Sequence, residues 1–248
     1  MLLRIIKALS LSLLLTVQPL WAAPVVCGVI QTYSALESIK DSSKVKFETF
    51  YGTQLELRDR ILLSGDRCDV LVTDEEKLPK ILIDADRALY ENVSKLVRAP
   101  LILWSGNRFL FQKDISAITK KKLRSLIVPK AHLTSVGYAA NQVLNHKDFP
   151  IDYLEKKGKI FKADHEYQAY SLLEPGNVQV GFLTKPLIMK DAKTTGSYWY
   201  IPNEYYDPIY YYLVMLSEDP ATRAVCDLLS DPAFALRHFK QAGFESVD

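Results

Sequence analysis

The sequence has only three cysteines, Cys27, Cys68 and Cys226. Three is too few for a disulfide-rich scaffold, and an odd number rules out full pairing within the chain. Cys27 and Cys68 each begin a strand-like run, so a disulfide joins them if those two strands are neighbours. The alternative is three buried thiols that pack as small apolar side chains.

Motifs for metal binding, nucleotide binding and covalent catalysis are also missing. The four histidines have neither HExxH nor HxH spacing, and no Cys-x-x-Cys pair occurs, so the sequence predicts no metal site. Gly-x-Ser-x-Gly, Walker and Gly-x-Gly-x-x-Gly elements are absent from the sequence as well. We therefore expect no cofactor and no enzymatic activity, although local motifs do not test a triad assembled from distant residues.

The sequence lacks an excess of charge of one sign. It has 31 Lys and Arg and 29 Asp and Glu, and two of the cations, Arg4 and Lys7, lie in the first few residues. Without those two the balance is 31 − 2 − 29 = 0. A neutral body has no basic surface for nucleic acid or for an anionic membrane, so we expect neither as a partner.

The first residues form the one long apolar stretch. Residues 1–7 carry positive charge, residues 8–21 are nearly all apolar, and Ala22 follows. This order is typical of a secretory signal peptide, and the run is shorter than the ~20 residues of a membrane span. We expect residues 1–22 to be a cleaved signal peptide and the mature chain to be periplasmic. Leu20 is not the small residue preferred before a cleavage site, which leaves an uncleaved anchor as the alternative.

Short apolar runs alternate with helical patterns along the rest of the chain, which predicts parallel sheets covered by helices. We expect strands over residues 25–30, 45–51, 68–72, 96–104, 126–129, 160–161, 178–183, 198–201 and 209–216. We expect helices between residues 53 and 65 and over residues 34–40, 75–81, 114–126, 134–143, 151–157, 165–173, 220–229 and 232–242.

The order of these elements predicts two α/β units in series. The last strand and the last two helices have no sheet of their own, so we expect them to return to the first unit, with crossings near residues 101–105 and 202–208. The prediction is an α/β fold of two lobes, each a mostly parallel sheet flanked by helices. Lobe 1 comprises residues 23–103 and 207–248, and lobe 2 comprises residues 104–206. Paired crossover segments form a hinge, with a cleft between the lobes.

Polar side chains follow the ends of the expected strands in both units. They are Gln31, Thr32, Tyr33 and Thr53 in the first unit and Ser135 and Thr184 in the second. Ligands of open α/β sheets bind outside the carboxyl ends of the strands, where helix N-termini supply N–H donors for an anion. The sequence therefore predicts an anion site without a lysine, although each residue taken alone is equally an ordinary helix cap.

Five segments occur in an order and spacing that resemble a known family. They are residues 33–39 (YSALESI), 50–54 (FYGTQ), 65–74 (GDRCDVLVTD), 178–184 (VQVGFLT) and 228–244, which holds LLSDP and ends in AGF. The chain resembles the periplasmic molybdate/tungstate-binding proteins, which are type II solute-binding proteins of ABC importers. The resemblance implies the two-lobed type II periplasmic binding protein fold and a monomer that captures a molybdate-type oxyanion between its lobes. It also implies an ABC permease in the inner membrane as the partner.

The resemblance carries the ligand-binding role to Thr32, Thr53, Ser135 and Thr184, with Gln31, Tyr33 and Glu166 as further positions. The chain departs from the family pattern at several of them. Gln31-Thr32 stands for a serine, Gly52-Thr53 for consecutive serines, and Thr184 for a tyrosine that donates its hydroxyl. Tyr170 or a tyrosine within residues 205–212 is the alternative source of that hydroxyl.

Glu166 falls at or beside a position that is apolar in the family. A carboxylate facing a dianion at ~4 Å costs several kcal/mol in a partly desolvated cleft. Three outcomes are open. Glu166 points away and leaves only its N–H at the site, or it accepts a hydrogen bond from a protonated oxyanion, or the ligand is not an oxyanion.

Seven tyrosines lie within residues 198–212. They suit either a cleft for an organic or sugar-like ligand or the packing of a strand and a hinge. Together with the departures from the family pattern, they leave two alternatives to oxyanion transport. One is a small organic ligand, and the other is a periplasmic interaction or accessory protein that has kept the fold and lost the ligand.

Overall fold

The structure is a computed structural model that describes residues 22–111, 123–147, 149 and 151–247. Residues 1–21 of the expected signal peptide and residues 114–122 of an expected helix lie outside the described residues. Within the described ranges, no helix combines the length and the apolar character that crossing a bilayer requires.

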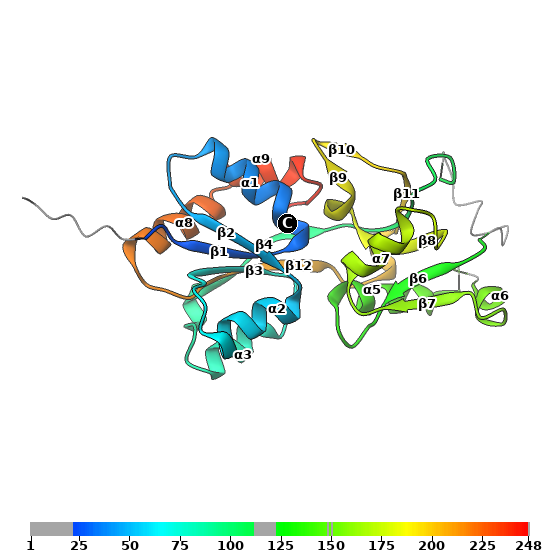
Figure 1. Cartoon of the computed structure of the whole chain (residues 1–248), viewed down its shortest axis with the longest axis horizontal. Coiled ribbons are helices and arrows are strands. Elements are labelled where there is room, and N and C mark those ends of the chain that lie inside the picture. Colours follow the sequence, from blue (N-terminus) through cyan, green and yellow to red (C-terminus); the bar gives the residue numbers. More distant parts are fainter. Residues whose placement is uncertain (1–21, 112–122, 148, 150, 248) are drawn as a thin grey trace, which may run out of the picture.

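The described chain folds into two lobes, each built on a five-stranded sheet (Figure 1). The sheet of lobe 1 has the order β2-β1-β3-β12-β4. Its strands are β1 (Val25–Val29), β2 (Glu48–Gly52), β3 (Val70–Thr73), β4 (Val93–Ala99) and β12 (Ile209–Met215). Its helices are α1 (Tyr33–Ser42), α2 (Gln54–Asp59), α3 (Leu78–Asp84), α8 (Pro220–Ser230) and α9 (Ala235–Gln241).

The strands of lobe 1 are mostly parallel, as the alternating pattern predicts. β1 pairs in parallel with β2 and β3, and β12 runs antiparallel to β3 and β4. Helices α1 and α9 lie on one side of this sheet and α2 and α3 on the other (Figure 1). With both faces covered, β1 and β3 are buried at every position, which explains why they read as continuous apolar runs.

Lobe 2 has a second sheet of the order β11-β5-β8-β6-β7. Its strands are β5 (Leu101–Ser105), β6 (Leu126–Pro129), β7 (Ile160–Ala163), β8 (Val180–Thr184) and β11 (Ser197–Tyr200), and β9 (Met189–Lys190) and β10 (Lys193–Thr194) form a small hairpin. Its helices are α5 (Ser135–Leu144), α6 (Asp152–Glu155) and α7 (Glu166–Leu173). β6 pairs in parallel with β7 and β8, and β5 and β11 add antiparallel pairs.

The strand expected over residues 96–104 is divided at Pro100. β4 ends at Ala99 in the first sheet and β5 begins at Leu101 in the second. Proline has no N–H for a sheet ladder, so the chain leaves one sheet and enters the other there. We therefore place the first crossing at Pro100, next to the residues 101–105 near which it was expected. The N–H of Leu101 bonds the hydroxyl of Tyr206 at 3.0 Å, which ties this crossing to the returning segment.

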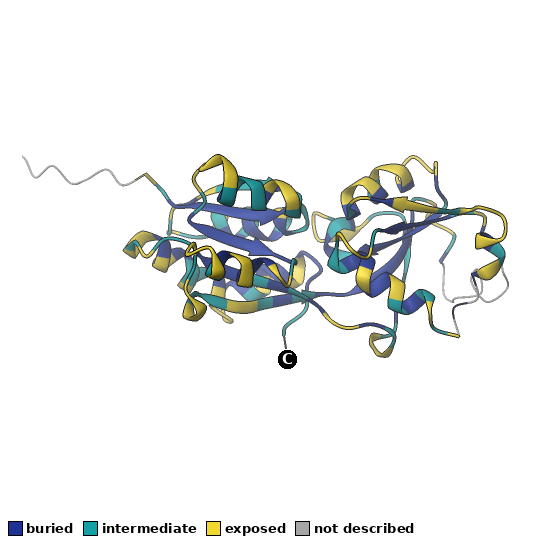
Figure 2. Cartoon of the chain, turned by 90° about the horizontal axis from the view of Figure 1, so that it is seen from below, coloured by how far each residue is buried: buried dark blue, intermediate teal, exposed yellow. Residues whose placement is uncertain are grey.

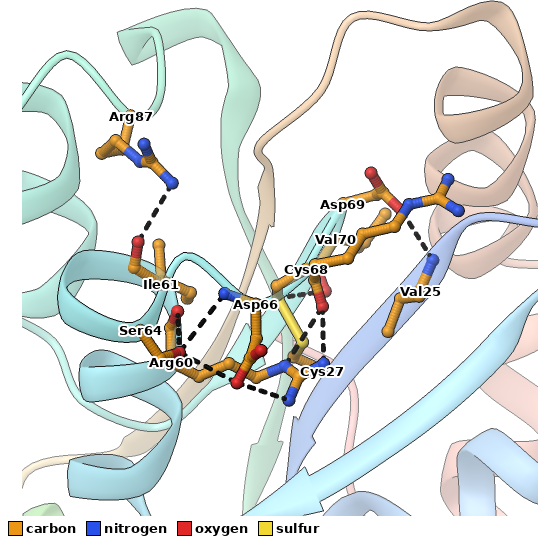
Figure 3. Close-up of a disulfide and its surroundings, with 11 residues drawn as sticks. Val25, Cys27, Arg60, Ile61, Ser64, Asp66, Cys68, Asp69, Val70 and Arg87 are labelled. Atoms are coloured by element: carbon orange, nitrogen blue, oxygen red, sulfur yellow. Dashed lines mark hydrogen bonds and ion pairs between the residues drawn. A yellow bond between two sulfur atoms is a disulfide. The ribbon is translucent and has the colours of Figure 1, made fainter.

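A disulfide joins Cys27 on β1 to Cys68 just before β3 (Figure 3). The two strands are neighbours, and the Cα atoms lie 5.9 Å apart. Beside it, the Asp69 carboxylate accepts the N–H of Val25 at 2.8 Å. Of the two readings of the cysteines, the structure therefore has the pairing of Cys27 with Cys68, and Cys226 is free.

The core follows the sheets through both lobes. In Figure 2 the central strands of both sheets are buried, while the helices show exposed outer faces. One cluster of buried apolar side chains extends from β1 and β3 through the crossings into lobe 2. The packing at the crossings fixes the hinge end of the molecule and sets the strand ends of the two lobes opposite each other.

Candidate functional site

The carboxyl ends of strands from both lobes meet around one cavity. Its volume is about 310 Å³, and it is lined from lobe 1 by the β2–α2 and β3–α3 junctions and from lobe 2 by the β6–α5 and β7–α7 junctions. Residues that line it include Gln31, Thr53, Asp74, Thr134, His165 and Glu166. Loops at these junctions are where open α/β sheets bind ligands.

A second cavity of about 530 Å³ adjoins the first, and the two share Gln54, Asp74 and Thr134 in their walls. Strand β12 of lobe 1 contributes Tyr210 and Tyr212 to the wall of this second cavity, and α5 of lobe 2 contributes Tyr138. Part of the tyrosine-rich segment therefore lines an interlobe space rather than packing in the core.

Glu166 is the first residue of α7, and its side chain joins the two lobes. Its Oε1 accepts hydrogen bonds from the N–H of Thr184 and from the Thr184 hydroxyl at 2.8 Å, both at the end of β8. Its Oε2 accepts a bond from Nε2 of Gln31 at 2.6 Å, which comes from the turn after β1 in lobe 1. The donors of both lobes thus surround an anionic group that belongs to the protein itself.

The Glu166 side chain is almost completely buried, at 2% exposure. This burial raises the pKa of Glu166 to about 7, although the bonds from Thr184 and Gln31 oppose the shift. The nearby charge of Asp74 raises the pKa further. Burial favours the neutral form because the ionised carboxylate loses its hydration.

Asp74 follows β3 on the lobe 1 side and faces the same region. Its Oδ1 accepts a bond from Nε2 of Gln54 at 2.7 Å, and its backbone carbonyl accepts one from the Ser135 hydroxyl of lobe 2. Burial raises the pKa of Asp74 to about 6, against the lowering effect of Gln54. Asp74 therefore forms a second contact between the lobes and places a second carboxyl near Glu166.

Tyr211 on β12 carries a buried hydroxyl with no hydrogen-bond partner among the described residues. The side chain is fully buried, and its ring packs edge-on against Phe244 at 4.9 Å. Burial, then the charges of Asp74 and Glu166, raise the pKa of Tyr211 well above its usual range. Buried hydroxyls are normally bonded; this one lies beside the Thr184 hydroxyl, which opposes the rise in pKa, and near the two carboxyls, without a hydrogen bond of good geometry.

Three helix N-termini at the cavity, those of α2, α5 and α7, are capped by the protein's own side chains. On α2, the Thr53 hydroxyl accepts the N–H of Glu56, and the Glu56 carboxylate accepts the N–H of Thr53 at 2.7 Å. On α5, Thr134 accepts the N–H of Gly137 at 2.9 Å. On α7, Nδ1 of His165 accepts the N–H of Gln168 at 3.1 Å. These bonds satisfy donors that helix ends otherwise leave free for an anion.

The structure brings together part of the expected set. Gln31, Thr184 and Glu166 form one hydrogen-bonded group, while Thr53 lines the first cavity and Ser135 the second. Thr32 and Tyr33 are not in the walls of either cavity. The Thr32 hydroxyl is buried and bonds the carbonyl of Val29 at 2.7 Å, and Tyr33 is exposed with its ring against Tyr51. Their role in binding a ligand stays a prediction.

Other residues of the cavity were not predicted. Asp74 ends a buried strand in the same way as the polar residues that were chosen, so its position offered a signal. Arg58 is the one Lys or Arg side chain among the described residues that line the first cavity, and it lies one turn beyond Gln54 on α2. Tyr211 lies in the segment named as a source of a hydroxyl, but only the fold identifies it.

The charge of the first cavity is predominantly negative. Its walls carry Asp74, Glu75, Asp164 and Glu166 against Arg58. Two unit charges ~4 Å apart interact by about 4 kcal/mol at the effective dielectric constant of a partly buried site. A fully charged anion that enters this space meets repulsion of that size unless a proton lies between it and a carboxylate. Among the described residues, no cluster of three or more potential ligand side chains is placed to hold a metal ion.

Comparison with models of known protein families identifies the family of this chain. The model of the bacterial extracellular solute-binding proteins matches residues 28–245, which cover both lobes. The chain belongs to this family.

Relatives with curated names are molybdate-binding proteins. The chain is 29% identical over 136 residues to ModA of Azotobacter vinelandii and 25% identical over 186 residues to ModA of Rhodobacter capsulatus. The first match covers 53% of each chain, so the aligned region spans about half the length of that relative. The second covers 74% of this chain and 71% of the relative.

The fold is similar to that of a solved periplasmic molybdate-binding protein from Azotobacter vinelandii. That comparison has a TM-score of 0.76 at 23% identity and covers 91% of this chain and all of the other. The match confirms the expected two-lobed α/β fold and the resemblance to the molybdate-binding proteins.

Proposed function

We propose that this chain is a periplasmic solute-binding protein that captures a small oxyanion, of the molybdate type in size and shape, between its lobes. The proposal includes export by the signal peptide, action as a monomer, and delivery of the ligand to an ABC permease. Solute capture requires no catalytic step, and we propose none.

The observation that carries the proposal is the donor set around Glu166. Three donors from two lobes converge on one carboxylate, namely Nε2 of Gln31 and the N–H and hydroxyl of Thr184. The unbonded Tyr211 hydroxyl adds a fourth donor in the same region. The Gln31 bond crosses from lobe 1 to lobe 2 and forms only when the lobes meet, which supports anion binding coupled to lobe closure.

A titration of the folded protein tests this function. Isothermal titration calorimetry with molybdate, tungstate, sulfate and phosphate should give saturable heat with at least one of them. Thr184→Val keeps the shape of the side chain but removes a hydroxyl that holds the Glu166 carboxylate in place, so it should weaken binding of that ligand at least tenfold, the size of one lost hydrogen bond to a charged group. The matched control is Thr194→Val, at an exposed position on β10, which should leave the affinity unchanged.

A second candidate is a small organic ligand, favoured by the adjoining cavity with Tyr138, Tyr210 and Tyr212 in its walls. Tyrosine faces and hydroxyl edges suit such ligands. A folded protein that gives no heat with any of the four oxyanions contradicts the first proposal. A thermal shift with sugars or organic acids in the same experiment then supports the second. Absence of both favours an accessory role without a solute.

A further inference from the structure

Glu166 is held in one position by contacts from both lobes. Thr184 of lobe 2 and Gln31 of lobe 1 bond its two oxygens, and the side chain is 2% exposed. It also forms part of the wall of the 310 Å³ cavity. The carboxylate is therefore a fixed part of the binding surface rather than a mobile side chain at its rim.

When it is ionised, this carboxylate can take further hydrogen bonds only as an acceptor. An ionised carboxylate has about four lone-pair sites, and three of them are taken by Gln31 and Thr184. At a pH above about 7, the value to which burial raises the pKa of Glu166, the carboxylate is ionised, and a group that lies against the fourth site must then supply the proton. An oxyanion with no proton offers only acceptors and leaves the contact unbonded.

The other charged groups near Glu166 do not reverse the preference for a ligand that donates a hydrogen bond. The other titratable groups that face it or share its cavity come from both lobes. They are Asp74 from the end of β3, Tyr211 on β12, Arg58 and Glu75 on the lobe 1 side, and His132, Asp164, His165 and Tyr167 on the lobe 2 side. Acidic groups outnumber Arg58, the one fixed cation among the described residues there. The surroundings therefore favour a ligand that brings a donor.

We propose that Glu166 sets the specificity of the cleft by accepting a hydrogen bond from an oxyanion that keeps an acidic proton and by rejecting oxyanions that have none. The proposal rests on the proposed function. Hydrogen phosphate belongs to the first class, and sulfate and molybdate belong to the second. A site built to bond a proton rejects a close analogue that lacks one by a large factor, because the buried acceptor is then left unpaired.

The test compares inorganic phosphate, sulfate and molybdate by calorimetry at mildly alkaline pH, where phosphate keeps one proton. The wild-type protein should bind phosphate at least tenfold more tightly than sulfate or molybdate. Glu166→Gln keeps the shape of the side chain and places a donor beside the ligand, so it should bind sulfate and molybdate at least tenfold more tightly than the wild type. The matched control is Glu75→Gln, which removes a charge from the same cavity but none of the bonds to Gln31 and Thr184, and should change these affinities less.

Each outcome decides the matter. A wild-type protein that binds sulfate or molybdate as tightly as phosphate overturns the role of Glu166 and leaves the proposed function standing. Equal gains in Glu166→Gln and Glu75→Gln also overturn it, because the effect is then general charge repulsion. No binding of any oxyanion by folded wild-type and Glu166→Gln proteins overturns the proposed function itself. If Glu166→Gln does not fold, the selectivity of the wild-type protein decides the proposal alone.

Discussion

Replacing Glu166 by glutamine should flatten the dependence of folding stability on pH. The pKa of Glu166 is raised from 4.5 to about 7 by burial, so the folded protein holds this proton more tightly than the unfolded chain does. The stabilising effect is complete below about pH 4.5 and is lost as the pH rises through about 7. A shift of this size corresponds to on the order of 3 kcal/mol, at 1.36 kcal/mol for each pKa unit.

Urea unfolding between about pH 5 and about pH 8, followed by circular dichroism, measures this effect. The wild-type protein should lose free energy of unfolding across this range. Glu166→Gln should lose clearly less, because the carboxyls whose pKa burial raises are then Asp74, with a pKa of about 6, and the half-buried Glu75. Glu218→Gln, at an exposed position, is the control and should follow the wild type. Equal slopes of the free energy of unfolding against pH in the wild type and in Glu166→Gln would refute the raised pKa of Glu166 in the folded protein.

Three further predictions concern the frame of the site. Reducing the Cys27–Cys68 disulfide opens a link between residues 41 apart in sequence and should lower the free energy of unfolding by about 4 kcal/mol in urea; an unchanged midpoint contradicts this. Thr53→Ala removes the capping box of α2 and should lower the free energy of unfolding by about 1 kcal/mol, measured by thermal unfolding. An unchanged free energy of unfolding would contradict this role of the cap. Gly137→Ala places a Cβ 2.6 Å from the carbonyl oxygen of Pro129 and should lower the free energy of unfolding by about 2 kcal/mol. An unchanged melting temperature would contradict this close packing of α5 against the end of β6.

The fold could be predicted because its signals are local. Apolar runs such as those of β1 and β3 are buried on both faces, and their length and spacing already indicate a sheet covered by helices. Pro100 was visible within the run of residues 96–104, but its consequence was not. A proline inside an apolar run marks either an edge or a change of sheet, and only the pairing of β4 with β12 and of β5 with β8 distinguishes them.

The candidate site was harder to predict because its contacts join distant residues. The sequence indicated that Gln31, Glu166 and Thr184 belong near a ligand, but the bonds among them cross separations of 135 and 18 residues. It left open which way Glu166 points, and the structure has its carboxylate bonded to donors of both lobes. Asp74 was missed as a member of the site, and Tyr211 was included only as one of the tyrosines of residues 205–212, because burial and the hydrogen-bond partners of a group are properties of the packed chain.

The amide of Thr184 tests the central claim most directly. Its N–H donates a hydrogen bond to the Glu166 carboxylate, and we propose that the captured oxyanion lies against that carboxylate. In a ¹⁵N-labelled protein titrated with phosphate, the Thr184 amide resonance should shift with a saturable curve that matches the calorimetric Kd, while that of Thr194 on the exposed hairpin stays in place. Saturable binding heat with an unmoved Thr184 resonance would contradict the account and place the ligand elsewhere.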